Sequence, residues 1–134
     1  MKQFPETENA LVLRTDFSDN AAWVSICKAI REPVGDFQAN VDLLSKTEYD
    51  GINTEQVVSA AQGTNRTFMF VVDKTTLTHP DRPVLCIDLF DQPGRTFRLI
   101  PSEMWSVENN LSIANMDFRE FASAVDQDGV FRGF

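Results

Sequence analysis

Short apolar runs alternate with segments of helical spacing along the first part of the chain. Residues 11–14 form an apolar run that ends at turn-prone residues, which is typical of a buried strand. A helix beginning near residue 21, with Ser18 or Asp19 as its N-cap, should follow. Its apolar positions have i, i+3, i+4, i+7 spacing: Trp23, Ile26, Cys27 and Ile30. Residues 37–44, where polar and apolar side chains alternate, predict an edge strand.

The middle of the chain contains a further helix and the most continuous apolar run. Asn53 and Gln56 have the form of a capping box, which predicts a helix over residues 54–62. Residues 67–72 are apolar almost throughout, as expected of a strand buried on both faces. Residues 75–83 hold two prolines and little periodicity, so we expect a long loop there.

The last third predicts a hairpin and two helices. Residues 84–90 and 95–100 flank a Pro-Gly turn and should pair as antiparallel strands. A helix over residues 103–114, with Ser102 as its N-cap, should come next. Asp117 and Glu120 form another capping box, which predicts a last helix. The tail 130–134 either packs on the domain or presents its aromatic side chains to a partner.

This order of elements predicts a single α/β domain over residues 1–134. Right-handed crossovers make the first three strands parallel, and the hairpin adds two antiparallel strands. We therefore expect a mixed sheet with strand order 2-1-3-4-5, covered by about four helices. The 134 residues, 43% of them hydrophobic, are enough for one core without disulfides or metals.

Two features of the composition bear on the compartment. The only two cysteines, Cys27 and Cys86, lie within apolar patterns and not at metal-ligand spacing, which favours a reducing environment. The first residues lack the apolar core of a secretion signal, and no run approaches the roughly 18 apolar residues of a membrane span. We therefore expect a cytoplasmic protein without a membrane segment.

The charge is strongly negative, because 12 Lys and Arg residues face 20 Asp and Glu residues for a net charge of -8. Such a field repels nucleic acids and anionic membranes, and it accelerates encounter with a basic protein. Solubility alone is the simpler explanation and carries at least equal weight. The sequence lacks both the phosphate-loop and the dinucleotide-binding signatures, so no cofactor is predicted.

Carboxylates at the predicted strand ends are the first candidates for chemistry. Asp16 and Asp19 follow the first strand and Asp73 follows the third, so they converge if these strands are neighbours. Such a group could bind Mg²⁺, although Asp16 and Asp19 also fit a strand end followed by a helix cap. His79 could be a general acid or base beside Asp73 or Asp81, but a role in fixing its loop is favoured.

Nucleophilic catalysis and an exposed tryptophan are further candidates. Cys86 would have to leave a core-like strand to act with His79, and a buried thiol more often behaves as a small hydrophobic group. Trp105 is either an interface anchor or, the favoured alternative, a core residue of its helix.

Several segments carry a resemblance to a known family. They are residues 14–19, 75–80, 93–98, the string PSEMWSVENNLSIANMDF over 101–118, and DGVFRGF over 128–134. The chain resembles a mainly bacterial family, domain of unknown function 6924, over nearly its whole length, with residues 45–65 matching only loosely. This resemblance implies a stand-alone single domain and carries no activity, cofactor or catalytic residue.

The main hypothesis is therefore a non-enzymatic, acidic protein-binding module, an inhibitor or immunity-type protein that covers a basic partner. The residues expected to contact that partner are Asp16, Asp19, Asp73, Asp81, Trp105 and Glu108. The alternative is a small metal-dependent or ligand-binding enzyme built on Asp16, Asp73 and His79, with Arg14 or Arg95 for an anionic group. A structural homo-oligomer is a third possibility.

Overall fold

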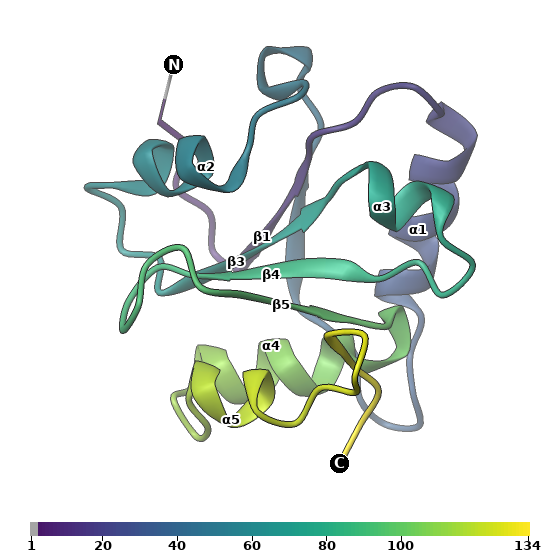
Figure 1. Cartoon of the computed structure of the whole chain (residues 1–134), viewed down its shortest axis with the longest axis vertical. Coiled ribbons are helices and arrows are strands. Elements are labelled where there is room, and N and C mark those ends of the chain that lie inside the picture. Colours follow the sequence, from purple (N-terminus) through teal and green to yellow (C-terminus); the bar gives the residue numbers. More distant parts are fainter. Residues whose placement is uncertain (1–2) are drawn as a thin grey trace.

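A six-stranded mixed sheet forms the centre of the computed structural model, which describes residues 3–134 (Figure 1). The strands are β1 (Ala10–Arg14), β2 (Val41–Leu44), β3 (Phe68–Val72), β4 (Val84–Asp88), β5 (Thr96–Leu99) and β6 (Val130–Phe131). They lie in the order β2-β1-β3-β4-β5-β6. β1 is parallel to β2 and β3, β4 is antiparallel to β3 and β5, and β6 is parallel to β5. The single α/β domain and the predicted order 2-1-3-4-5 are confirmed, and β6 extends the sheet by one strand.

Five α-helices and two 3₁₀ turns connect the strands within the described residues. They are α1 (Asn20–Arg31), η1 (Thr47–Tyr49), α2 (Thr54–Ala61), α3 (Lys74–Thr78), η2 (Pro101–Glu103), α4 (Met104–Ser112) and α5 (Phe118–Ala122). Local sequence explains where three of them begin. The Asp19 side chain accepts a hydrogen bond from the Ala22 backbone N–H at the start of α1, and Asn53 and Asp117 each head a complete capping box.

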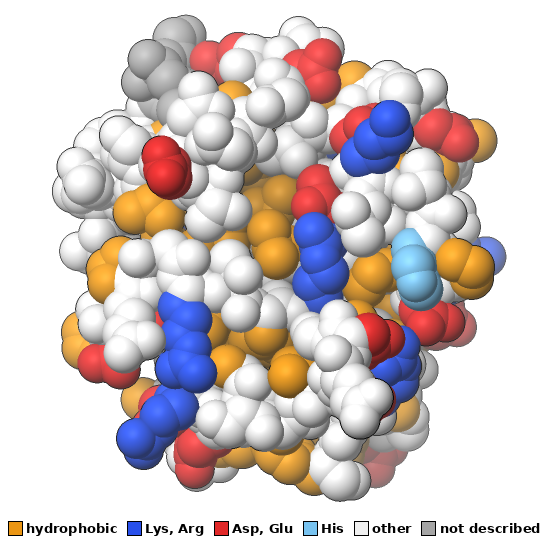
Figure 2. Space-filling view, in the orientation of Figure 1, with side chains coloured by type: hydrophobic (Ala, Val, Ile, Leu, Met, Phe, Trp, Pro, Cys, Tyr) orange, Lys and Arg blue, Asp and Glu red, His pale blue; other side chains and the backbone are white. Residues whose placement is uncertain are grey.

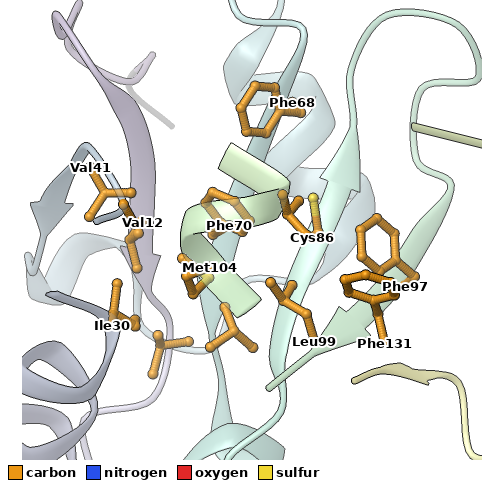
Figure 3. Close-up of a cluster of buried hydrophobic side chains, with 14 of the residues drawn as sticks. Val12, Ile30, Val41, Phe68, Phe70, Cys86, Phe97, Leu99, Met104 and Phe131 are labelled. Atoms are coloured by element: carbon orange, nitrogen blue, oxygen red, sulfur yellow. The ribbon is translucent and has the colours of Figure 1, made fainter. Parts of the chain in front are cut away.

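The sheet is buried on both faces because its strand residues alternate between two hydrophobic clusters. Val12, Phe70, Cys86 and Leu99 pack on the face covered by α1, α4 and α5 (Figure 3). The opposite cluster contains Leu11, Leu13, Met69, Val71 and Ile87 together with residues of α2. All five residues of β3 are buried, as its uninterrupted apolar sequence predicted.

Three local predictions were wrong in detail. The segment 75–83 is not all loop, because Asp73 and Thr76 form a capping box that starts α3. β2 begins only at Val41, and Phe37 instead closes a tight turn through an isolated bridge to Val34. Ser102 does not cap α4, since the chain enters that helix directly from η2.

The first two residues of the predicted tail 130–134 form strand β6. Phe131 of β6 is fully buried and its ring lies 5.2 Å from that of Phe121, so the tail packs on the domain. The Phe134 side chain is 78% exposed, although its ring is 5.0 Å from that of Phe131.

Candidate functional site

Asp16 and Asp73 lie where the strand pattern placed them. β1 and β3 are adjacent and parallel, and the Thr15 N–H donates to the Val72 carbonyl at 3.0 Å just beyond the paired residues. The two aspartates therefore follow neighbouring strands at one edge of the sheet, which we call the carboxyl edge. Whether either carboxylate can bind a ligand depends on the hydrogen bonds and ion pairs that it already makes.

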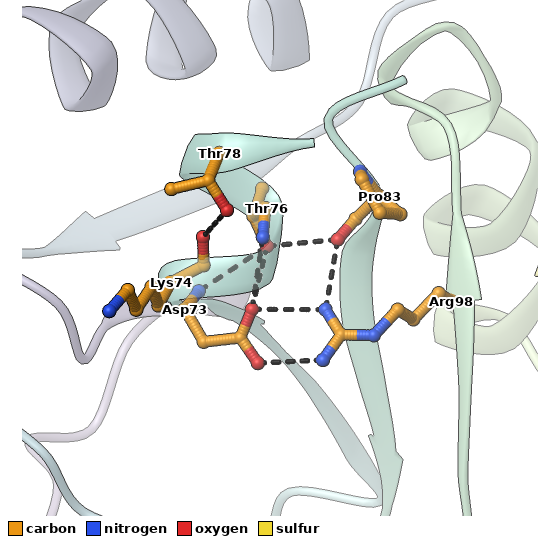
Figure 4. Close-up of polar contacts among 6 residues, drawn as sticks. All are labelled: Asp73, Lys74, Thr76, Thr78, Pro83 and Arg98. Carbon is orange, nitrogen blue, oxygen red and sulfur yellow. Dashed lines mark hydrogen bonds and ion pairs between the residues drawn. The ribbon is translucent and has the colours of Figure 1, made fainter. Parts of the chain in front are cut away.

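The Asp73 carboxylate is engaged by Arg98 of β5 and by the start of α3 (Figure 4). Arg98 donates to it twice, from Nη2 to Oδ2 at 2.7 Å and from Nη1 to Oδ1 at 3.0 Å, and the Thr76 backbone N–H adds a bond of 3.1 Å. Arg98 Nη1 also donates to the Pro83 carbonyl. Burial by itself raises the pKa of Asp73, but the bonds and charge of Arg98 and the bonds from Thr76 outweigh it and hold the pKa below its ordinary value.

Asp16 and Asp19 also bond within their own turn. Asp16 Oδ1 accepts from the Ser18 hydroxyl at 2.5 Å and from the Ser18 N–H at 2.9 Å, and these bonds lower the pKa of Asp16. Asp19 is the N-cap of α1. Within residues 3–134, no three His, Cys, Asp or Glu side chains lie close enough together to hold a metal ion.

His79 and Asp81 belong to a polar cluster that joins the α3–β4 loop to the C-terminal segment. His79 Nδ1 accepts from the Asp81 backbone N–H at 3.0 Å, an arrangement that fits the loop-fixing role. The Asp81 carboxylate pairs with Arg132 at 2.9 Å, and Arg132 also pairs with Asp126 and Asp128. These contacts connect the loop to the segment that carries β6.

Three other predicted residues, Arg14, Trp105 and Glu108, contribute to the packing and hydrogen bonding of the fold. Arg14 is 4% exposed, donates from Nε to the Asp16 carbonyl, and lies over the ring of Phe17 at 4.2 Å, so its guanidinium does not face an open site. Trp105 is half-buried and stacks on Phe37 with ring centroids 4.5 Å apart. It is therefore partly core and partly surface.

Glu108 is the predicted contact that the structure places farthest from solvent, at 4% exposure. Its carboxylate accepts from the Asn40 N–H at 2.6 Å, from Asn109 Nδ2 at 2.8 Å and from the Ser112 hydroxyl at 2.6 Å. These bonds tie α4 to the residue that precedes β2. A buried carboxylate with three donors stabilises the fold and is not available to a partner.

A groove of about 630 Å³ lies between the β4–β5 turn and the α4–α5 connection. These two loops lie on the same side of the molecule, at the left of Figure 1, away from the carboxyl ends of β1 and β3. The residues that line the groove are Thr67, Phe68, Asp88, Phe90, Asp91, Leu111, Ala114, Asn115, Met116, Asp117, Phe118, Arg119 and Glu120. We call it the turn groove.

Two large, exposed apolar residues belong to the two loops that border the turn groove. Phe90, which lines it, is 76% exposed, and Ile113, between the lining residues Leu111 and Ala114, is 75% exposed. The sequence pattern extended the strand 84–90 through Phe90 and so assigned its ring to the sheet. In the structure β4 ends at Asp88, and Phe90 belongs to the turn.

Buried Asp88 holds this turn in shape. Its carboxylate accepts from the backbone N–H groups of Phe90 and Gln92, each at 2.9 Å, and of Asp91 at 3.4 Å. The backbone that presents the Phe90 ring is therefore fastened to the end of β4. An Asp at a strand end whose carboxylate accepts backbone N–H groups two to four residues later is a common turn pattern, and Asp88 is the sequence signal for it here.

The exposed charges at the turn groove are mainly negative. Asp91, Asp117 and Glu120 contribute three exposed carboxylates, and Arg119 contributes one exposed guanidinium. Asp117 and Glu120 each accept one backbone N–H through their capping box, at 2.9–3.0 Å, and among residues 3–134 neither makes a salt bridge.

A smaller hollow of about 180 Å³ lies over the sheet face beside α2. It is lined by Val57, Val71, Leu85, Ile87 and Asp73, among others. Figure 2 shows this face, with hydrophobic side chains visible in a depression at its centre next to acidic and basic ones. Its only charged lining group is Asp73, which is already paired with Arg98.

A family model described as "Domain of unknown function (DUF6924)" matches residues 9–134. No curated protein matches the sequence. Among residues 3–134, no helix combines the length and the apolar character that crossing a membrane requires.

Proposed function

The chain belongs to the DUF6924 family, and we propose that it is a non-enzymatic, acidic protein-binding module of the inhibitor or immunity type that covers a basic partner. The observation that carries this proposal is the turn groove, where exposed Phe90 lies beside carboxylates that form no salt bridge among residues 3–134, with exposed Ile113 on the adjoining α4–α5 connection. Free thiols at Cys27 and Cys86 fit the reducing cytoplasm as the compartment.

Exposed aromatic and aliphatic side chains support binding because their burial by a partner releases water from apolar surface. Interface hot spots combine such a side chain with a surrounding rim that excludes water. A standard interface buries about 800 Å² on each partner, so the turn groove would form the centre of a larger contact. The net charge of -8 adds long-range attraction toward a basic surface.

The enzyme alternative has less support from the geometry. A general base or metal ligand needs a carboxylate with a free lone pair facing a cavity. Asp73 is paired with Arg98, Asp16 accepts from Ser18, and His79 Nδ1 accepts from the backbone of Asp81. The Asp73 carboxylate, one oxygen of Asp16 and the Nδ1 atom of His79 therefore already have partners within the fold, and no three metal-ligating side chains cluster among residues 3–134.

Affinity capture from native cells tests the proposal when two charge-matched variants are run beside the wild type. The groove variant is Asp91→Asn/Asp117→Asn, and the control is Glu48→Gln/Asp50→Asn, two exposed carboxylates outside the groove. At low salt we expect a stoichiometric basic companion on the wild type and the control but not on the groove variant. This companion should dissociate from the wild type and the control as salt rises.

Two results would count against the proposal. A companion that remains bound at high salt and is acidic would contradict the charge argument. A wild-type protein that elutes alone at low salt, where attraction is strongest, would contradict the binding function itself.

A further inference from the structure

We propose that the turn groove takes an extended segment of the basic partner in which a large apolar side chain is flanked on both sides by Lys or Arg. This inference rests on the proposed function and specifies the chemistry of the partner at that site. It follows from the different character of the groove's floor and rim.

The floor of the turn groove is apolar and adaptable. Phe68 and Phe118 are almost fully buried, and half-buried Leu111 and Met116 lie beside them. Met has a flexible, polarizable side chain that adjusts to different ring or branched shapes. A single large apolar side chain entering between Phe90 and Met116 would remove apolar surface from water on both molecules.

The rim carries carboxylates on two sides of this floor. Asp91 lies on the β4–β5 turn, whereas Asp117 and Glu120 lie at the start of α5. A peptide that crosses from the turn to α5 therefore meets Asp91 before its central side chain and a net negative charge after it, because Asp117 and Glu120 outnumber Arg119. Cations on both sides of the anchor complement this arrangement, and anionic flanks are repelled by it.

Both sides of the rim are held in place before any partner arrives. The Asp88 carboxylate fastens the turn that carries Phe90 and Asp91. The reciprocal bonds of Asp117 and Glu120 orient the other two carboxylates. Binding to preorganised groups loses less conformational entropy, so a short segment gains affinity that a mobile loop would not give it.

The test is an NMR titration of the ¹⁵N-labelled full chain, at low salt, with a synthetic capped pentapeptide Gly-Lys-Phe-Lys-Gly. Two matched peptides replace its Phe with Ser or both of its Lys with Glu. We expect the Lys-Phe-Lys peptide to shift the amide signals of Phe90, Asp91, Met116 and Asp117. Each matched peptide should bind at least about tenfold more weakly, because each lacks one of the two complementary features.

Phe90→Ala provides the matched change in the protein. Phe90 is exposed, so the variant should stay folded, and its affinity for the Lys-Phe-Lys peptide should fall about tenfold. Val24→Ala, which truncates an exposed apolar side chain on α1, is the control and should leave that affinity unchanged.

Three results would overturn the inference. The first is an equal response to the Lys-Ser-Lys peptide, which would mean unspecific charge attraction. The second is a set of shifts outside the turn groove. The third is a change of the groove signals with protein concentration alone, which would make a second copy of the chain the occupant.

Failure of this inference is separable from failure of the proposed function. A captured basic companion that binds Phe90→Ala as well as wild type keeps the binding function and removes the groove as its site. Specific peptide binding in the groove without any captured companion keeps the site and contradicts the proposed partner.

Discussion

The carboxyl edge and the turn groove lie at opposite ends of the strands and use the same residue types in opposite ways. At the carboxyl edge, the carboxylates of Asp16 and Asp73 accept hydrogen bonds from Ser18, Thr76 and Arg98. At the turn groove, Asp91 lies exposed beside the apolar ring of Phe90. The comparison teaches that a carboxylate at a strand end is available to a ligand only where the fold has not already supplied its donors.

The same contrast occurs within three residues of one turn. Asp88 is 2% exposed and accepts three backbone N–H groups, whereas Asp91 is exposed. Asp88 shapes the turn and Asp91 faces the surface that the turn presents. Sequence position alone does not separate the two roles.

The largest effect on stability should come from breaking the carboxyl edge with Asp73→Ala. The variant loses the cap of α3, which typically contributes about 1 kcal/mol, and leaves the partly buried Arg98 without its partner, which costs more than breaking a surface pair. We expect a loss of about 2–3 kcal/mol in the free energy of unfolding, measured by urea denaturation. The matched variant Asp91→Ala should change it by less than about 0.5 kcal/mol.

An Asp73→Ala loss no larger than that of Asp91→Ala would contradict the difference between the two edges. A double-mutant cycle with Arg98→Met separates the ion pair from the cap. In that cycle the two losses should be far from additive, because both changes remove the same interaction.

Much of the fold was predictable because it depends on local signals. The capping boxes at Asn53 and Asp117 and the uninterrupted apolar run of β3 each act over a few residues. α3 was not predicted because two prolines and weak periodicity indicated a loop over residues 75–83, although Asp73 and Thr76 have the spacing of a cap. β6 was missed because two residues carry too little periodicity to predict a strand.

The candidate site was less predictable because it depends on contacts between distant segments. Arg98 lies 25 residues from Asp73, and the Asn40 N–H that occupies Glu108 lies 68 residues away. No spacing rule connects such pairs. The turn groove likewise joins the β4–β5 turn to the α4–α5 connection, which approach each other only when α4 packs on the sheet.

A second, smaller effect at the carboxyl edge is a dependence of the free energy of unfolding on pH through Asp73. The pKa of Asp73 in the folded protein lies below its ordinary value of about 3.9. The folded state therefore binds this proton less readily than the unfolded state. The resulting stabilisation is present above about pH 4 and is lost as the pH falls through the folded-state pKa.

Asp73→Asn removes this titration and retains a good N-cap. We expect the wild type to exceed this variant in unfolding free energy at neutral pH, and the gap to narrow as urea denaturation is repeated toward about pH 2. A gap that stays constant over this range would show that the carboxylate charge of Asp73 does not contribute. Asp16→Asn should behave in the same direction, because Ser18 lowers the pKa of Asp16.

The smallest change in stability, and the sharpest separation of roles, is expected for Asp117→Asn in the turn groove. Asn caps a helix about as well as Asp, so the bond from the Glu120 N–H can persist, and the unfolding free energy should stay within about 0.5 kcal/mol. Asp117→Ala should cost about 1 kcal/mol, because it removes that bond. Urea denaturation measures both.

Peptide affinity should rank these two variants differently from stability. If the charge of Asp117 is what a basic segment recognises, Asp117→Asn and Asp117→Ala weaken the Lys-Phe-Lys peptide equally, although only the second loses stability. If Asp117→Asn binds as wild type does and Asp117→Ala does not, the residue acts through the cap alone. Asp117 would then belong with Asp16 and Asp73 as a carboxylate that the fold has already used, and the contrast between the two edges would rest on Asp91 and Glu120.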